Sequence, residues 1–293
     1  LAYYWLQIGG HLAISANLRQ ALILAHLWRR ERYPLHMKRI VVFTVDHLEF
    51  SPLVMEKLLQ EHQAEIVRIY VSRTHLGVSF IFRKLVFFIR NFYPFCISLG
   101  DMFRYLKWKW RIRKDAHGYR NVVEVLSARG FDTRYVQDVN DKNFINEMKS
   151  LDADIFVFCL FDQIAKDEVF AIPSKGTFNL HMGKLPEHRG MLSAFWVLRH
   201  GNDTAGVSFH EVTNIIDGGN LITEARNPVT TNSMYQLMRD TADKGALVVA
   251  DGVNRVLDGK DIPIDQSGRE KHYYAIPSKE DFRAFYARGC RLI

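Results

Sequence analysis

Residues 38–71 read KRIVVFTVDHLEFSPLVMEKLLQEHQAEIVRIYV, and this stretch decides the fold. Two short runs rich in β-branched residues, 40–44 and 65–71, enclose an amphipathic segment at 51–61. Alternating strand and helix signals are typical of a parallel sheet, because parallel strands need a crossover connection between them. The alternation continues to residue 181. We therefore predict an α/β fold with a Rossmann-like, doubly wound, mostly parallel sheet.

The remaining elements follow from the same patterns. Further strands are expected at 133–137, 154–160 and 177–181, and further helices at 119–129 and 141–150. The order then changes to a helix at 193–200, β-rich runs at 205–212 and 220–226, and a long helix at 233–257. The apolar stripe of this long helix indicates core packing. The turn-rich tail after residue 261 holds one short helical pattern, so we expect only a short C-terminal appendage.

The composition bounds the class of protein. Of 293 residues, 48% are hydrophobic and 24% are charged, which is ordinary for a folded protein and excludes a disordered chain or a polytopic membrane protein. The three cysteines are widely spaced and form no CxxC pair, so neither zinc nor a redox dithiol is indicated. We expect a reducing, cytoplasmic compartment, and we expect Cys159 to be a buried hydrophobic side chain.

The chain divides into three parts. Its first eighteen residues are apolar, but Gln7, His11 and Asn17 interrupt them and no basic region precedes them, so we predict no transmembrane span there. Met37 stands directly before the first expected strand, in the position of a natural start. The preceding residues are then either an extension or an artefact of an upstream reading frame. The expected parts are an N-terminal extension at 1–36, a main domain at 37–260 and a tail at 261–293.

Positive charge is concentrated in one segment. The formal net charge is +7, but residues 80–114 carry nine basic residues against the single acid Asp101, a formal charge of +8. Residues 1–36 add +3, which leaves −4 for the rest of the chain. The basic charge therefore describes two local segments, and it does not indicate a general nucleic-acid-binding surface.

The basic segment 80–114 also has an amphipathic pattern. Apolar residues recur on one helical face while Arg83 and Lys84 fall on the other, and Trp108 and Trp110 follow. Interleaved rings and cations are typical of a helix that lies in a membrane interface. Two alternatives stay open: a helix packed on the sheet with a solvated basic face, and a patch that recognises an anionic substrate. Peripheral contact with the inner membrane face is thus one of three interpretations.

Two polar residues end the expected strand at 177–181. Asn179 and His181 are two positions apart, so their side chains point to one side of the strand, at the sheet edge where α/β proteins bind ligands. An amide NH₂ and an imidazole N–H can both donate to the oxygen of a tetrahedral acyl-transfer intermediate. Asp217, in NIIDGGN at 214–220, could orient the histidine or accept a proton. A DGG sequence alone is a common turn, with positive φ expected at its glycines.

The surrounding strings make this constellation specific. They read NLHMGKLP at 179–186, HRG at 188–190, GVSFH at 206–210 and IDGGNLI at 216–222. In order and spacing, these motifs resemble the folate-dependent formyltransferase family, which includes enzymes that act on methionyl-tRNA, glycinamide ribonucleotide and amino sugars. The resemblance runs from about residue 38 to residue 261, and it implies a formyltransferase catalytic domain.

The resemblance implies residue roles and a donor. Asn179 and His181 would hold the formyl oxygen, while Asp217 would place the histidine and help to take the proton from the attacking amine. The donor would be 10-formyltetrahydrofolate, with its pterin ring between the loops at 160–164 and 212–216. The carrier-binding residues expected in these loops are Leu160, Phe161, Gln163, Ile164, Val212 and Ile215.

The chain departs from the family pattern beside the histidine. Where the family usually has Ser-Leu-Leu-Pro, this chain has GKLP at 183–186, so a hydroxyl is lost and a cation is gained. His188 and His210 lie near the motif, but histidines that flank an active loop are more often structural than substrate contacts. No ligand-spaced set of His, Cys and Asp indicates a metal. The acceptor-binding residues expected here are Lys184, Arg189 and Gly190.

The acceptor amine is less constrained than the donor. Methionyl-tRNA formyltransferases carry an additional C-terminal domain, and only a short tail follows Gly259 here, so tRNA is disfavoured. Glycinamide ribonucleotide formyltransferases usually keep the Ser-Leu-Leu-Pro motif. We therefore expect a small amine, an amino sugar or a cell-envelope intermediate, on a nucleotide or lipid carrier. The alternatives are a formyltetrahydrofolate hydrolase, and a non-catalytic membrane-associated protein that binds folate or sugar.

Overall fold

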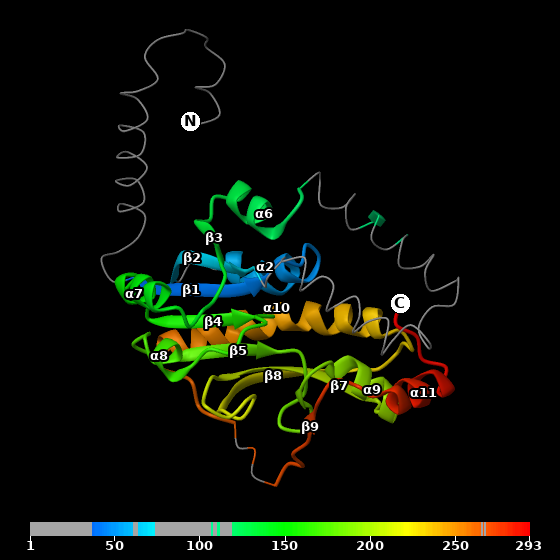
Figure 1. Ribbon diagram of the computed structural model, residues 1–293. Helices are drawn as coiled ribbons and strands as arrows, with labels where there is room; N and C mark the ends of the chain where they lie inside the picture. Colours follow the sequence, from blue (N-terminus) through cyan, green and yellow to red (C-terminus); the bar gives the residue numbers. More distant parts are fainter. Residues whose placement is uncertain are drawn as a thin grey trace. The chain divides into compact units, whose positions relative to one another are not determined.

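The central sheet has seven strands. The computed structural model describes residues 37–60, 64–73, 107, 110–111, 119–264, 266 and 268–293. The strands are β1 (Lys38–Val45), β2 (Ala64–Ser72), β3 (Thr133–Val136), β4 (Ile155–Cys159), β5 (Thr177–His181), β7 (Thr204–Glu211) and β8 (Leu221–Pro228). Their order is β3-β2-β1-β4-β5-β7-β8 (Figure 1). The first five are parallel and the last two antiparallel, which confirms the predicted α/β class and mostly parallel sheet.

Both faces of the sheet are buried, and the sequence of β1 shows why. Ile40 and Val42 face one side while Val41 and Phe43 face the other, and none of the four is more than 1% exposed. A parallel strand covered by helices on both faces needs apolar side chains on both faces. The uninterrupted apolar run in β1 is therefore the signature of its central position.

Helices cover the two faces in a doubly wound arrangement. On one face lie α2 (Phe50–Gln60), α6 (Val122–Ala128) and α10 (Met234–Asp258), and on the other lie α7 (Lys142–Ser150) and α8 (Asp167–Phe170). Helix α10 packs so closely on β7 that a Cβ on Gly252 would lie 2.2 Å from the Phe209 ring. Its apolar stripe, predicted as core packing, is confirmed. Cys159, predicted as a buried hydrophobe, is 0% exposed.

The C-terminal tail is built into the main domain. Residues 38–293 form one compact unit. Helix α11 (Lys279–Ala287) shares an aromatic cluster with α9 (Ser193–His200), and β9 (Tyr273–Tyr274) pairs with β6 (Arg189–Gly190). The predicted appendage thus contacts β6 and α9, which follow strand β5 in the sequence.

Some boundaries differ from the prediction for physical reasons. The helix expected from residue 119 begins at Val122, because the side chain of Asn121 caps it by accepting from Glu124 N. Strand β8 continues through Pro228, which an edge strand tolerates. The short helix α8 was not predicted, since four residues carry too little periodicity.

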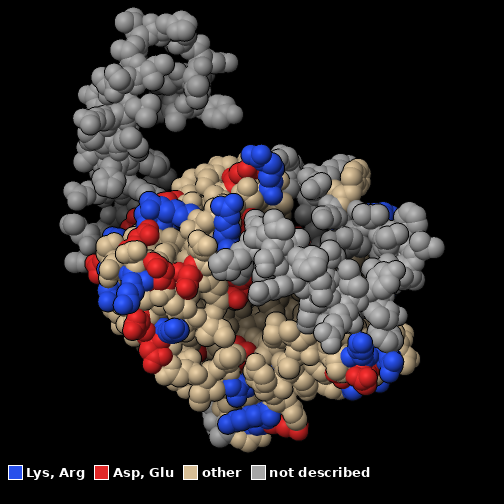
Figure 2. Space-filling view, viewed as in Figure 1, with Lys and Arg blue, Asp and Glu red and all other residues tan. Residues whose placement is uncertain are grey.

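The two basic segments lie almost wholly outside the described residues. These are the extension at 1–36 and the segment 80–114, of which only residues 107, 110 and 111 are described. Over the described part of the face in Figure 2, basic and acidic side chains are interspersed. Among the described helices, none is both long enough and apolar enough to cross a membrane. The three interpretations of segment 80–114 remain predictions.

Candidate active site

Strand β5 carries two polar side chains to the edge of the sheet. It runs parallel to β4 and antiparallel to β7, with Asn179 opposite His210. Phe178 and Leu180 point into the core beneath α10, so the alternation of the strand turns Asn179 and His181 to the other face. The two residues therefore share one side at the carboxyl end of the strand, where ligands bind in sheets of this kind.

The loop between β7 and β8 presents Asp217 to this edge. Asp217 has a positive φ of 50°, which is uncommon for a non-glycine residue. The expectation of positive φ at Gly218 and Gly219 is wrong. These glycines are required by close packing instead, since a Cβ on Gly219 would lie 2.0 Å from the carbonyl oxygen of Glu211. In this turn, the residue with the left-handed backbone conformation is therefore Asp217 and not one of the two glycines that follow it.

Asp217 meets groups from three different segments. The backbone N–H of Gly190 donates to its Oδ2 over 2.9 Å, and its Oδ1 lies 3.5 Å from His181 Nδ1 and 3.6 Å from His210 Nε2. Burial by itself would raise the pKa of Asp217. In their protonated forms the His210 and His181 rings, together with the Gly190 N–H, outweigh burial and hold that pKa well below its ordinary range. Asp217 is therefore an anion at neutral pH.

A hydrogen bond fixes the tautomer of His181. Its Nε2 lies 2.7 Å from the carbonyl oxygen of His188, and since a carbonyl only accepts, Nε2 carries the proton. Burial lowers the pKa of His181, against the opposing effects of Asp217 and the bond to His188. The ring is thus neutral near pH 7, with a bare Nδ1 facing Asp217. That nitrogen can take up a proton, and the carboxylate stabilises the resulting imidazolium.

His210 belongs to the site, although its position in the sequence favoured a merely structural role. Its Nδ1 donates to the carbonyl oxygen of Glu211 over 2.8 Å, so Nε2 is an acceptor and receives a hydrogen bond from Asn179 Nδ2 over 3.1 Å. This bond orients the amide and leaves its second N–H for a ligand in the cavity that Asn179 lines. In the sequence, the one signal for His210 is that it ends the GVSFH string. In the sheet, it lies directly opposite Asn179.

The C-terminal tail supports the Asp217 loop. Gly190 pairs with Tyr274, has a φ of 95°, and would place a Cβ 2.2 Å from the Tyr274 carbonyl oxygen. Only glycine fits there. Arg189 donates through Nε to the carbonyl oxygen of Ile216 over 3.1 Å. Arg189 and Gly190, expected as acceptor contacts, thus brace the Asp217 loop. The pairing joins two strands of two residues each, which is too short a pattern to read from the sequence.

Two cavities flank the His181–Asp217 pair. The first, here the loop cavity, lies between the two loops predicted to bind the carrier and has a volume of about 380 Å³. Asn179 and Asp217 line it. Ile164 and Ile215 are 71% and 61% exposed, so they offer apolar surface to a ligand. The expected carrier-binding residues in its lining are Phe161, Gln163, Ile164, Val212 and Ile215.

One of the six expected carrier-binding residues lies outside the loop cavity, and another, Gln163, lines it with its side-chain amide already hydrogen-bonded to the protein. Leu160 lines the second cavity and not the loop cavity, and its φ of 59° turns the chain sharply after β4. The side chain of Gln163 accepts from Val139 N over 2.8 Å and donates to Ser72 Oγ over 2.9 Å. Gln163 therefore ties the loop after β4 to Val139 and Ser72. Leu160 belongs to the second cavity.

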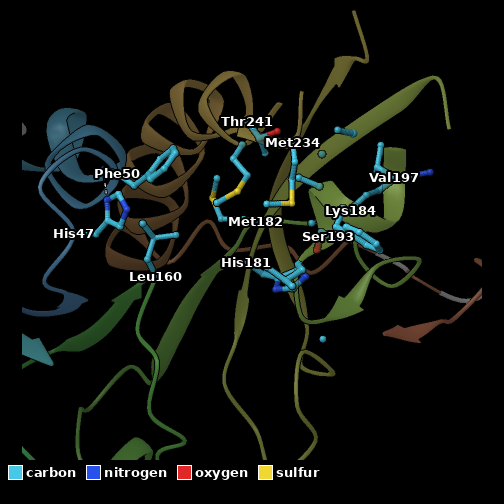
Figure 3. Close-up of a pocket in the computed structure, with 18 of the residues that line it drawn as sticks. His47, Phe50, Leu160, His181, Met182, Lys184, Ser193, Val197, Met234 and Thr241 are labelled. Atoms are coloured by element: carbon cyan, nitrogen blue, oxygen red, sulfur yellow. Dashed lines mark hydrogen bonds between the residues drawn. The ribbon is translucent and has the colours of Figure 1, made fainter. Parts of the chain in front are cut away.

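The second cavity, here the methionine cavity, has a volume of about 310 Å³. It is named for Met182, Met234 and Met238 in its lining. Figure 3 shows Met182 and Met234 above His181, and Met234 is the first residue of α10. Lys184, expected as an acceptor contact, lines this cavity, but its Nζ pairs with Glu187 over 2.8 Å.

The glycine that departs from the family pattern is matched by Ser193. A Cβ on Gly183 would lie 2.4 Å from Ser193 Oγ and 2.6 Å from His181 Nε2. Ser193 Oγ also lies 3.4 Å from the carbonyl oxygen of His188. The Ser193 hydroxyl, at the start of α9, therefore lies in the space that a side chain at position 183 would need.

The chemistry of the site follows from these groups. A neutral imidazole, an oriented amide and a carboxylate meet at one sheet edge. Such a set can stabilise an oxyanion and take a proton from a nucleophile, as acyl transfer requires. Within the ranges that the structure describes, no three His, Cys, Asp or Glu side chains are grouped so that they could hold a metal ion.

Comparison with known proteins points to one family. Residues 107–253, half of the chain, match the family model described as formyl transferase. Methionyl-tRNA formyltransferase from Caldanaerobacter subterraneus is 26% identical over 54% of this chain and 52% of its own length. Bifunctional polymyxin resistance protein ArnA from Wigglesworthia glossinidia brevipalpis is 31% identical over 35% of this chain and 16% of its own length. The chain spans at most about half the length of these relatives.

Solved structures share the fold. Glycinamide ribonucleotide transformylase 1 from Symbiobacterium toebii superposes with a TM-score of 0.53 at 13% identity, covering 83% of this chain and 96% of that one. The N-formyltransferase from Helicobacter canadensis, solved with folinic acid and dTDP-3-aminofucose, has a TM-score of 0.52 at 16% identity and covers 82% and 71% of the two chains. At these identities, the superpositions establish the Rossmann-like architecture and nothing finer.

Proposed function

The chain belongs to the formyl transferase family, and on that premise we propose that it moves a formyl group from 10-formyltetrahydrofolate to a primary amine. The observation that carries the proposal is the meeting of Asn179, His181 and Asp217 between two cavities at the carboxyl edge of the sheet. One cavity takes the carrier and the other takes the acceptor, so the formyl group passes across the catalytic residues.

The donor side is the loop cavity. Its lining combines the apolar side chains of Phe161, Val212 and Ile215 with the open backbone of two loops. Flat heterocycles bind in such places, because apolar side chains cover their faces while a few polar groups pair with their edges. A pterin ring in this cavity lies beside Asn179 and Asp217, as formyl transfer from its carrier requires.

The reaction needs one oxyanion donor and one proton carrier. The amine attacks the formyl carbon, and the second N–H of Asn179 donates to the oxygen that becomes negative. His181 Nδ1 takes the proton that the amine loses, and Asp217 stabilises the imidazolium. The carbon–N10 bond of the carrier then breaks, and His181 returns the proton to N10. Because Nε2 donates to His188, we assign His181 the proton rather than the formyl oxygen that the resemblance implies.

The acceptor class rests on the relatives. An ArnA protein and a sugar N-formyltransferase solved with dTDP-3-aminofucose support an amino sugar or a cell-envelope intermediate as acceptor. Methionyl-tRNA formyltransferases are also among the relatives, so methionyl-tRNA belongs in any acceptor panel. We favour the small amine, since the methionine cavity holds about 310 Å³.

The proposal is tested by release of tetrahydrofolate. The full chain is incubated with 10-formyltetrahydrofolate and, in turn, nucleotide-linked amino sugars, glycinamide ribonucleotide or methionyl-tRNA, and tetrahydrofolate is followed spectrophotometrically. We expect release to depend on an amine and to be fastest with an amino sugar. Equal release without any amine identifies a hydrolase, and no release under any condition identifies a binding protein. Either result contradicts the proposal.

A further inference from the structure

The methionine cavity has a mostly apolar described lining. It begins at the His181 ring and extends toward α2, α9 and the start of α10. Figure 3 shows side chains from these separate elements converging on one space. The apolar side chains that line it are Val45, Phe50, Leu160, Met182, Leu192, Ala194, Phe195, Val197, Ala205, Met234 and Met238. Unbranched methionines adapt to irregular ligands, so the wall fits an apolar body.

The polar side chains of this lining are already engaged. Thr241 Oγ1 donates to the carbonyl oxygen of Leu237 over 2.8 Å, and His47 Nδ1 accepts from Phe50 N over 3.3 Å. Ser193 Oγ lies 3.4 Å from the carbonyl oxygen of His188, to which His181 Nε2 also donates. Each hydroxyl or ring nitrogen named here therefore already serves the fold of the wall.

The cation of the lining is neutralised. Lys184 Nζ pairs with Glu187 over 2.8 Å, and Glu187 in turn lies 3.8 Å from Arg269. Arg269 is itself held by Glu224 over 2.7 Å. The lysine is thus the end of a chain of ion pairs. A phosphate or carboxylate that entered the cavity would lose its water and meet no free cation in the described lining, which is costly for a charged group.

We infer that the acceptor presents its amine on an uncharged, largely apolar body, such as the deoxygenated face of an amino sugar, and that this body occupies the methionine cavity. The inference rests on the proposed function for the identity of the reaction. If the acceptor is joined to a charged nucleotide or lipid group, that group lies outside the methionine cavity. The apolar wall favours an uncharged acceptor, and the cost of burying a charge disfavours a charged one. Both effects raise the specificity, because specificity is the difference between two affinities.

A matched pair of acceptors tests the inference with the unmodified chain. A 6-deoxy amino sugar and the corresponding amino sugar 6-phosphate are compared for formylation, and the binding of each is measured by calorimetry. We expect kcat/KM and affinity to be at least about tenfold higher for the 6-deoxy compound. Equal or better use of the 6-phosphate overturns the inference but leaves the formyl transfer intact. If neither is formylated, the proposed function fails for these amines, and the calorimetric ratio still decides the inference.

A pair of lysine variants on α10 locates the effect. Met238→Lys places a cation in the methionine cavity, whereas Leu247→Lys places one on the same helix at a side chain that is 53% exposed and outside the cavity. We expect Met238→Lys to lower the 6-deoxy to 6-phosphate ratio at least about tenfold and Leu247→Lys to leave it unchanged. An unchanged ratio in a folded Met238→Lys variant overturns the assignment of this wall. Circular dichroism checks folding, and the acceptor pair remains decisive if the variant does not fold.

Discussion

The loop cavity and the methionine cavity meet at the proposed catalytic residues but differ in chemistry: Asn179 and Asp217 line the first, and His181 lines the second. The loop cavity has exposed apolar side chains beside an anion, an oriented amide and open backbone. The methionine cavity has half-buried methionine side chains and hydrocarbon, and the polar groups described above are bound within its own wall. Because the two cavities differ in chemistry, two unlike ligands can approach Asn179, His181 and Asp217 without competing for the same cavity. We propose that recognition is divided between the cavities, with Asn179, His181 and Asp217 at the boundary between them.

Removing the shared residues is expected to have the largest effect, because it disables both sides at once. We predict that His181→Ala and Asp217→Asn each lower kcat/KM by at least roughly two orders of magnitude, the usual scale for a proton carrier or its counter-charge. Tetrahydrofolate release in steady state measures this. Asp243→Asn is the matched control, since that carboxylate is exposed on α10. Near-normal activity in either site variant would contradict the assigned roles.

A double-variant cycle tests the boundary between the cavities. Gly183→Ser restores the residue that the family usually has, but its Cβ would lie 2.4 Å from Ser193 Oγ and 2.6 Å from His181 Nε2. We predict that this change lowers kcat at least about tenfold, a barrier increase of about 1.4 kcal/mol. Combining it with Ser193→Gly removes the closest of these contacts and returns a hydroxyl from position 183, while the contacts with His181 Nε2 and the His188 carbonyl oxygen remain. The double variant is therefore expected to recover part of the activity, and strictly additive losses would show that the two positions are independent.

The central sheet could be predicted because its strands are buried on both faces. Composition and local order alone are enough to predict two of these strands. They are the run from Ile40 to Thr44 and the strand that ends with Asn179 and His181. The support of the site could not be predicted in this way. Gly190 opposite Tyr274 and Asn179 bonded to His210 depend on contacts between distant segments, and such pairings leave no local periodicity.

The departures at single residues have the same cause. The sequence indicates a glycine turn around Asp217, but only the packing of Gly219 against Glu211 decides that Asp217 takes the positive φ. Likewise, Leu160 follows an apolar strand and reads as part of the carrier loop, yet its backbone turns it into the methionine cavity. Backbone direction at one residue decides which ligand a side chain meets.

A smaller effect is expected when one cavity alone is altered. Ile215, 61% exposed in the loop cavity, is available to cover a bound ring. We predict that Ile215→Ser raises KM for 10-formyltetrahydrofolate about five- to tenfold, through the loss of about 1 kcal/mol of apolar burial, and leaves KM for the amine unchanged. Ile262→Ser, at a residue 81% exposed outside both cavities, is the control. A rise in KM for the amine alone would reverse the roles of the two cavities.

The smallest effect on activity is expected from His188, whose carbonyl holds His181. Burial lowers the pKa of the His188 ring to about 4, and the ring stacks on Tyr274. In the unfolded chain, His188 therefore binds a proton once the pH falls below the ordinary histidine pKa. In the folded chain, the same ring binds a proton only near pH 4. We predict that the free energy of unfolding falls between pH 6.5 and 4 by up to about 3 kcal/mol through this residue.

Replacing the ring isolates that contribution. His188→Phe keeps the stacking and the backbone carbonyl but cannot be protonated, and the buried Nδ1 of the wild-type ring forms no hydrogen bond within the described part of the chain. Denaturant unfolding at several pH values should give a shallower pH dependence for this variant, with kcat at pH 7 within about twofold of the wild type. Identical pH dependence in the two proteins would contradict the low pKa of His188.

We propose above all that the formyl group crosses from the loop cavity to an amine at His181. The most direct measurement follows an isotopically labelled formyl group on 10-formyltetrahydrofolate through a single turnover, with a 6-deoxy amino sugar present. We predict that mass spectrometry finds the label as a formamide on the amine, and that Asp217→Asn abolishes its formation. Label recovered as formate at the same rate with and without the amine would contradict the account.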